Sequence, residues 1–142
     1  MTAKEYLQGY REIESNYNVM VESYKNVESQ MINLKSPGFD ERVKTSAKSD
    51  PIGTIVCNLE DEKAKIGLKI IELNAKMILI KNQINSMNEV DSDYYAILLL
   101  RYIMYKDWRF ICDSLSVSRT QANRLHGRAL QEFNKKFLKK RA

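Results

Sequence analysis

Residues 107–130 read DWRFICDSLSVSRTQANRLHGRAL, and this stretch decides how the C-terminal part of the chain is expected to fold. It contains Asp107 and Ser118, residues of the type that begins helices, because their side-chain oxygens accept a hydrogen bond from the first helical turn. Apolar residues follow each of them at helical spacing. We therefore predict a short helix from residue 108 to about 115 and a longer one from 119 to about 137, separated by a tight turn.

The apolar residues of this stretch fall where the two helices of a helix-turn-helix touch. Such a unit needs apolar side chains in its shared core, a small residue where the helices meet, and an apolar residue in the turn. These six positions are occupied, suitably in every case, by Ile111, Cys112, Leu115, Val117, Ala122 and Leu125. Ser116 departs from the pattern, because a left-handed backbone is expected there and costs a non-glycine residue about 1 kcal/mol.

With Ala122 and Leu125 facing inward, the polar side chains of the second helix face outward or to its flanks. Arg can form two hydrogen bonds with guanine in the major groove, Asn and Gln can do so with adenine, and Thr can contact the thymine methyl group. The free N–H groups at a helix N-terminus favour phosphate. We therefore predict that the helix 118–137 lies in the major groove of duplex DNA. The predicted DNA-binding residues are Arg109, Ser118, Arg119, Thr120, Gln121, Asn123, Arg124 and Arg128.

The distribution of charge also points to a polyanionic partner for the C-terminal part. Residues 1–100 carry 12 Lys and Arg against 15 Asp and Glu, whereas residues 101–142 carry 11 against 3. Arg109, Arg128 and the trailing lysines are placed for phosphates, where they would set affinity rather than sequence preference. A basic tail that only raises solubility is the alternative, because five of these positive charges lie within 135–141.

The N-terminal part contains an apolar seam whose spacing alternates between four and three residues. This pattern is typical of a long helix that packs along one face, as in a coiled coil. The seam residues are Tyr6, Tyr10, Ile13, Tyr17, Met20, Tyr24, Val27, Met31 and Leu34. Its tyrosines can pack in the seam while their hydroxyl groups reach water. A stacking platform for nucleic-acid bases is the alternative, but the seam spacing already accounts for every tyrosine.

A second seam begins after Asp50-Pro51, a pair that suits an N-cap and a first helical turn. It consists of Ile52, Val56, Leu59, Lys63, Ile66, Ile70, Leu73, Met77, Ile80, Ile84 and Met87. Lys63 is its one polar member, and it either marks the register or extends its ammonium group to water. The residues between the two seams include Ser-Pro-Gly and mixed charges, which predict a flexible linker over residues 35–50.

These patterns predict an all-α fold: a long antiparallel helical hairpin over residues 1–90, followed by a three-helix helix-turn-helix domain with a basic tail over residues 91–142. The hairpin helices would span about 3–34 and 51–88. The first helix of the domain would run from 93 to about 104 after a cap at Asp91 or Ser92. Because a single hairpin buries only one stripe of each helix, we expect a homodimer through the hairpin or another protein partner.

Several classes of function are not expected from this sequence. Cys57 and Cys112 lie 55 residues apart, and neither belongs to a zinc-binding cluster. We find no secretory signal, no apolar run long enough for a membrane and no phosphate-binding glycine loop, so we expect a cytoplasmic protein. The single histidine, His126, has no ligand or catalytic partners at a useful spacing and is either a surface residue or close to a phosphate. We predict neither enzymatic activity nor a metal or other cofactor.

Residues 100–133, LRYIMYKDWRFICDSLSVSRTQANRLHGRALQEF, resemble region 4 of bacterial sigma factors. In that family a recognition helix is followed by an Ala-Leu pair, here Ala129-Leu130. The whole chain resembles small phage-encoded, sigma-like regulators of the autolysin regulatory protein type. The likeness is carried by the N-terminal "Tyr-Arg" helix, the Asp50-Pro51 restart and the series Arg101-Tyr102-Ile103, Trp108, Ile111, Ser118, Arg124-Leu125-His126 and Ala129-Leu130.

The resemblance implies a transcriptional activator of phage late genes, such as lysis or packaging genes, that works with RNA polymerase in the cytoplasm of a bacterial host. Its promoter-facing residues would be Ser118, Arg119, Thr120, Gln121, Asn123 and Arg124. Two other functions remain open. One is a small terminase subunit that recognises packaging-site DNA, and the other is an adaptor whose tyrosine-rich hairpin docks another protein.

Overall fold

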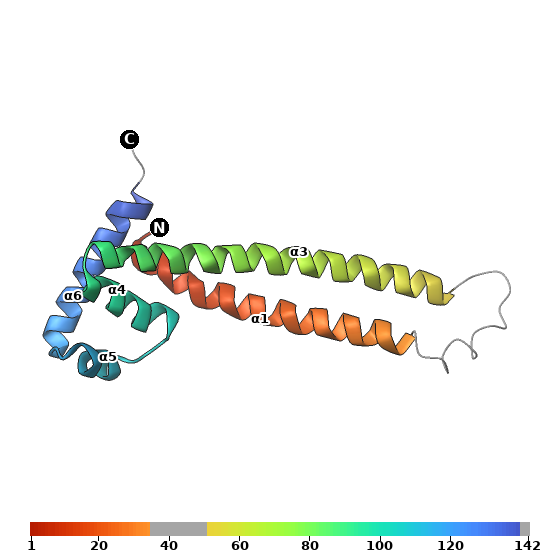
Figure 1. Ribbon diagram of the computed structural model, residues 1–142, viewed down its shortest axis with the longest axis horizontal. Coiled ribbons are helices and arrows are strands. Elements are labelled where there is room, and N and C mark those ends of the chain that lie inside the picture. The colour runs from red at the N-terminus through yellow and green to blue at the C-terminus, as the bar shows by residue number, and fades with distance from the viewer. Residues whose placement is uncertain (35–50, 140–142) are drawn as a thin grey trace. The chain divides into compact units, whose positions relative to one another are not determined.

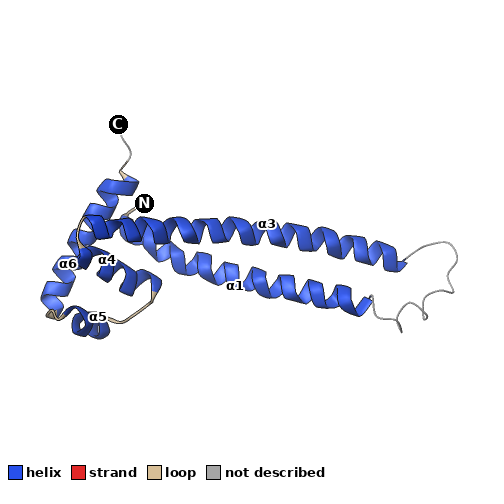
Figure 2. Ribbon diagram, in the orientation of Figure 1, coloured by secondary structure: helices blue, strands red, loops and turns tan. Residues whose placement is uncertain are grey.

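The computed structural model describes residues 1–34 and 51–139, and these residues form helices and short connections without any strand (Figure 2). The elements are α1 (Ala3–Leu34), α3 (Pro51–Ser86), a 3₁₀ turn η1 (Met87–Glu89), α4 (Ser92–Leu98), a π-helical turn η2 (Leu99–Ile103), α5 (Trp108–Leu115), α6 (Arg119–Phe133) and a second π-helical turn η3 (Asn134–Leu138) (Figure 1). The predicted all-α fold is confirmed. The predicted linker 35–50, with the Asp50 cap, and the last two basic residues of the tail lie outside the described residues.

The chain divides into two compact units. The first, here called the multi-helix unit, comprises Met1–Glu14 and Ala75–Ala142, and the second, the two-helix unit, comprises Ser15–Asn74. Both α1 and α3 run from one unit into the other. The bounds of these units therefore differ from the predicted ranges 1–90 and 91–142, because the ends of both long helices belong with the C-terminal helices.

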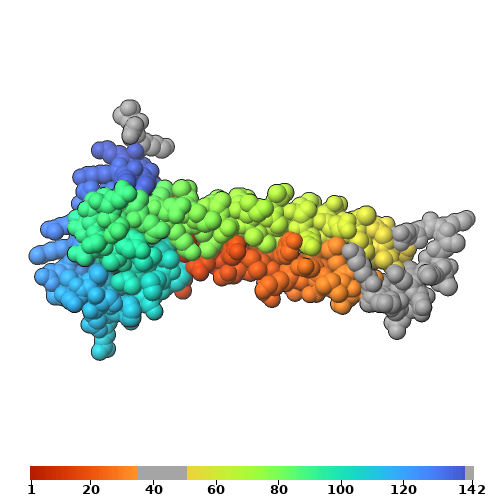
Figure 3. All heavy atoms as spheres, viewed as in Figure 1, coloured from red at the N-terminus to blue at the C-terminus, as the bar shows by residue number. Residues whose placement is uncertain are grey.

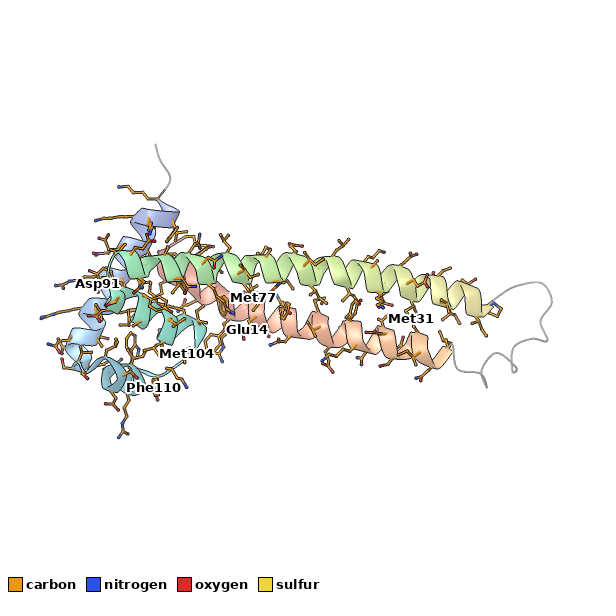
Figure 4. The ribbon with its side chains drawn as sticks, in the orientation of Figure 1. Glu14, Met31, Met77, Asp91, Met104 and Phe110 are labelled. Carbon is orange, nitrogen blue, oxygen red and sulfur yellow. The ribbon has the colours of Figure 1, made fainter. Side chains whose placement is uncertain are left out.

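The two-helix unit consists of parts of α1 and α3 that lie side by side and run antiparallel (Figures 1 and 3). Among its described residues the buried side chains are Val27, Met31 and Leu73, and Met31 lies between the helices in Figure 4. Every member of the two predicted seams is buried or half-buried along the described helices. Lys63 extends its ammonium group over the Tyr24 ring, 5.2 Å from the ring centre, so this seam lysine is held by a cation–π contact.

The multi-helix unit has a core to which α1, α3 and the C-terminal helices all contribute. Its largest fully buried side chains are Leu7, Tyr10, Ile84, Met87, Ile97, Leu98, Ile111 and Phe133. The Tyr6 ring lies 5.9 Å from that of Phe133, and the Tyr6 hydroxyl donates to Gln83 Oε1 at 2.7 Å. This burial and hydrogen bond join the N-terminal turns of α1 to the last turns of α3 and to α6.

The helix predicted from 93 to about 104 has about the expected length, but only its first part is α-helical. It begins at Ser92, with Asp91 as its cap, since Asp91 Oδ1 accepts from the backbone N–H of Asp93 at 2.9 Å. It changes to the π-helical turn η2 after Leu98. Beyond η2, Tyr105 has a positive φ of 56°, which a side chain tolerates only when its surroundings hold it. Those surroundings are Glu14, which accepts from the Tyr105 hydroxyl, and the Arg11 guanidinium, 5.1 Å from the ring centre.

The last predicted helix also changes its type before its end. The α-helical hydrogen bonds of α6 stop at Phe133, and residues 134–138 form the π-helical turn η3 instead of continuing to 137. In this turn the Lys136 ammonium group donates to the carbonyl of Ser86 at 3.3 Å, at the end of α3. A carbonyl at a helix C-terminus has no partner within its own helix, so this lysine satisfies it.

Candidate nucleic-acid interface

The turn between α5 and α6 has the conformation that a helix-turn-helix requires. Ser116 ends α5 in the left-handed region, with φ 56° and ψ 46°. The following N–H, of Val117, donates to the carbonyl of Cys112 at 3.0 Å and closes the turn. The left-handed backbone expected at Ser116 is confirmed, although a serine rather than a glycine adopts it.

A capping box begins α6. Ser118 Oγ accepts from the backbone N–H of Gln121 at 3.2 Å, while Gln121 Oε1 accepts from the backbone N–H of Ser118 at 3.0 Å. The amide oxygen of Gln121 is therefore occupied, although its amide nitrogen is still available as a donor. A two-bond contact of Gln121 with adenine, as predicted, would use the second lone pair of this oxygen while the cap keeps the first. Asp107 caps α5 in the same way, accepting from the N–H of Phe110 at 2.8 Å.

The inward faces of α5 and α6 form the small shared core that was predicted. Ile111 and Ala122 are completely buried, and Ala129 continues that face two turns further along α6. The other four predicted core residues are half-buried, and they are Cys112, Leu115, Val117 and Leu125. Because small alanines occupy the contact face of α6, this helix can lie close to its neighbours, and most of its polar side chains are left outside.

All eight predicted DNA-binding residues are exposed: Arg109, Ser118, Arg119, Thr120, Gln121, Asn123, Arg124 and Arg128. By helical spacing, Thr120 and Arg124 lie opposite the buried alanines, together with Gly127 and Gln131. Gly127 was not among the predicted residues. A Cβ atom placed on it would meet nothing within 4 Å, so packing within the chain does not require a glycine there.

The two flanks of α6 differ in what surrounds their arginines. On one flank, Gln121, Arg124 and Arg128 line a shallow hollow of about 270 Å³ with Val117, Leu125 and, from α4, Asp93. On the other flank, the Arg119 guanidinium lies over the Trp108 ring, 4.9 Å from its centre. Arg101 lies over the same ring at 5.0 Å, so one indole contacts two guanidinium groups.

Arg101 is a functional candidate that sequence reasoning missed. It lies in η2, outside the helix-turn-helix, and its Nη1 donates to the carbonyl of Lys106 at 3.2 Å. Lys106 in turn lies over the ring of Phe110, 4.8 Å from its centre, and Phe110 is 44% exposed in the first turn of α5 (Figure 4). The basic surface around Arg119 therefore extends to the segment before α5. Sequence spacing gave no signal for this extension.

His126 is half-buried in an aromatic cluster and is therefore not the surface residue that was one of its two predicted roles. Its Nε2 is hydrogen-bonded to the Tyr102 hydroxyl at 2.7 Å, and the Trp108 ring meets it edge-on at 5.0 Å. Burial, and then the charges of Lys4 and Arg101, lower the pKa of His126 to about 4. The imidazole is neutral at physiological pH, so it brings no positive charge to a phosphate.

The trailing lysines differ among themselves in their contacts. Lys135 forms an ion pair of 3.5 Å with Glu132, Lys136 donates to Ser86, and Lys139 is exposed at the end of η3. Exposed ion pairs of this kind contribute little to stability. These side chains remain accessible to a polyanion, and they continue the positive charge of α6 toward its C-terminal end.

Within residues 1–34 and 51–139, no group of three or more His, Cys, Asp or Glu side chains is arranged to hold a metal ion. The same residues contain no helix whose length and hydrophobicity would let it span a bilayer. No family model matches the chain, and no curated protein or solved structure is detectably similar to it. Function is therefore inferred from the chemistry of the site itself.

Proposed function

We propose that this protein is a sequence-specific DNA-binding regulator of transcription whose α6 enters the major groove. The observation that carries the proposal is the asymmetry of α6, in which buried alanines face the core while arginine, threonine and asparagine side chains are exposed around a capped N-terminus. An α-helix fits the major groove, and these side chains match the hydrogen-bonding groups of its base edges. No catalytic role and no cofactor are part of this proposal.

We assign reading of the bases chiefly to Thr120, Asn123 and Arg124. Thr120 and Arg124 lie on the outermost face of α6, and Asn123 lies beside them. Arg119 is better suited to a phosphate, because its stacking on Trp108 fixes the guanidinium plane while its N–H edge can still donate. Arg109 and Arg128, which are exposed to either side, would contact phosphates further along the backbone.

The resemblance to phage sigma-like regulators extends this proposal to activation of late lysis or packaging genes in a bacterial host. In that role the protein would act with RNA polymerase, and the paired helices α1 and α3 would serve for self-association or for a polymerase contact. Opening of the promoter would belong to another factor, because no counterpart of the DNA-melting sigma region is recognised in the sequence.

The experiment is selection of bound fragments from phage and host DNA, followed by fluorescence anisotropy on the selected duplex. Arg124→Ala should weaken binding to the selected duplex by about 10- to 100-fold and relax its preference over random duplex, since one bidentate base contact contributes about 1–3 kcal/mol. Arg128→Ala should weaken binding to the selected and the random duplex by similar factors, and it should reduce the dependence of affinity on salt.

Lys25→Ala is the matched control, because it removes an exposed positive charge from α1 in the two-helix unit. Its binding should equal that of the unmodified chain. Equal affinity for selected and random duplex, with no loss on Arg124→Ala, would contradict a regulator that reads sequence. Selection of packaging-site fragments instead of promoters would support the terminase alternative.

A further inference from the structure

The helix α3 has a second apolar stripe that the hairpin does not cover. Leu68 is 69% exposed and Ile71 is 68% exposed, although both lie in the middle of a long helix. With Ala64 before them, they repeat the four-and-three spacing of a coiled-coil seam. The same spacing continues on α3 at Ala75 and at Ile78, which is 48% exposed. The covered seam of α3 uses none of these residues.

A groove lies beside this stripe in the two-helix unit. It is open, has a volume of about 700 Å³, and is lined by Tyr24, Met31, Glu60, Lys63, Ala64, Gly67, Leu68 and Ile71. A Cβ atom on Gly67 would lie 3.8 Å from Tyr24 Cε2, which is an ordinary contact. Packing within the chain therefore does not require this glycine, although a glycine inside a helix is destabilising by about 1 kcal/mol. Close approach of a second helix would account for it.

We propose that the Leu68–Ile71 face of α3 is a two-fold interface with the same face of a second copy, the two α3 helices running antiparallel. The face is self-complementary, because it carries large side chains and the recess of Ala64 and Gly67 within two turns of each other. A two-fold interface requires this property, since the same patch must supply both surfaces. The inference makes the proposed self-association of the hairpin specific and does not depend on DNA binding.

Charge selects the antiparallel arrangement. In a parallel pair Asp61, one heptad before Leu68, would face its own copy inside the seam, whereas in an antiparallel pair centred between residues 69 and 70 it would face Ile78 of the partner subunit, so that no two carboxylates meet. In the antiparallel pair Leu68 packs on Ile71 of the partner subunit, and Lys65 lies beside Glu72 of the partner subunit. Glu72 also forms an exposed ion pair of 3.7 Å with Lys69 on its own helix, and Lys65 would join this pair. Both contacts between the subunits occur twice because of the two-fold axis. Opposite charges that flank a seam are the usual determinants of orientation in coiled coils.

The test is analytical ultracentrifugation of the full chain from about 1 to 100 µM. The unmodified chain should sediment as a dimer, and Leu68→Lys or Ile71→Lys should raise the dissociation constant at least about 100-fold, because each puts two charges into an apolar seam. Ile32→Lys is the matched control, since Ile32 on α1 is 65% exposed but lies off this stripe. Circular dichroism should show unchanged helix content for all three variants.

The orientation is tested with a spin label on Cys57, which is exposed on α3, in a Cys112→Ala background. The two labels of an antiparallel dimer should be about 40 Å apart, at a rise of about 1.5 Å per residue from the proposed axis between residues 69 and 70. Lys65→Glu should weaken the dimer, and adding Glu72→Lys should restore it. A separation of about 10 Å, which parallel helices would give, would overturn the arrangement.

A chain that stays monomeric at about 100 µM, a dimer unaffected by Leu68→Lys and Ile71→Lys, or a ring of about eight copies would each overturn the interface. A failure of the DNA-binding proposal is distinguishable from these results. In that case the affinities for selected and random duplex would be equal, while the sedimentation of the chain would still show the dimer.

Discussion

The two units of this chain bury their apolar side chains to different depths. In the multi-helix unit Leu7, Ile84, Ile111 and Phe133 have no exposed surface. In the two-helix unit the buried side chains of the described residues are Val27, Met31 and Leu73, which keep 4–8% of their surface. Two helices can cover only one stripe of each other, whereas a third and fourth helix close the core from the remaining sides. The multi-helix unit is therefore suited to hold a rigid binding surface, and the two-helix unit to pack against a partner.

The largest test of this difference is truncation of one core side chain in each unit. Phe133→Ala should destabilise the multi-helix unit by about 3–5 kcal/mol, because the ring is completely enclosed and leaves a cavity. Met31→Ala should lower the free energy of unfolding by less, since two helices can move together and partly fill the cavity. Urea unfolding followed by circular dichroism gives both free energies of unfolding. Equal losses would show that the two-helix unit is packed as tightly as the other.

The next largest effect is expected at the cap of α6. Ser118→Ala removes the hydroxyl that accepts from the N–H of Gln121 and should lower the free energy of unfolding by about 1 kcal/mol. Ser114→Ala, at an exposed position within α5, is the control and should be neutral or slightly stabilising. Urea unfolding again provides the measurement. If both variants had the same stability, the capping box would not contribute to this unit.

A pair of glycine substitutions compares the two units directly. Gly127→Ala on α6 and Gly67→Ala on α3 should each stabilise its helix by about 0.5–1 kcal/mol, since neither added Cβ meets an obstacle in the chain. Each should weaken a different binding activity. Gly127→Ala should weaken DNA binding in anisotropy and leave sedimentation unchanged, whereas Gly67→Ala should weaken the dimer alone. Loss of both activities in either variant would mean that the two surfaces are not separate.

The smallest effect is a pH dependence that belongs to the multi-helix unit. In the unfolded chain His126 binds a proton near pH 6.5, whereas in the folded chain burial keeps the imidazole neutral until its pKa of about 4. Lowering the pH through this window therefore favours the unfolded state, and the stability present above pH 6.5 is progressively lost. Because His126 is the only histidine, urea midpoints at pH 7 and pH 5.5 should differ in the parent and coincide in His126→Gln. A difference that survives in His126→Gln would assign it to other groups.

Features that depend on neighbouring residues were predictable from the sequence. The seams, the caps at Asp107 and Ser118, and the left-handed Ser116 all follow from spacing within one or two helical turns. The capping role of Gln121 was also detectable, because a serine followed three residues later by Gln is a known helix start.

Features that join distant segments were not predictable in this way. The stacking of Arg101 and Arg119 on Trp108 brings together residues from η2, α5 and α6, and no periodicity relates them. The inclusion of Leu7 and Ile84 in the C-terminal core depends on where both long helices end. The exposed stripe with Leu68 and Ile71 is hidden in the sequence, since α3 carries apolar residues on two neighbouring faces and spacing alone does not reveal which face packs within the chain.

The continuity of α1 and α3 through both units has a consequence for how the chain opens. Backbone amides near Pro51 belong to a helix end held by half-buried contacts, whereas those near Ile84 belong to an enclosed core. Local unfolding of α3 should therefore begin at its Pro51 end. Hydrogen–deuterium exchange along α3 should slow steadily toward Ile84. The Ile84 end of α3, which leads into the proposed DNA-binding region, would keep its backbone hydrogen bonds while those near Pro51 open and close.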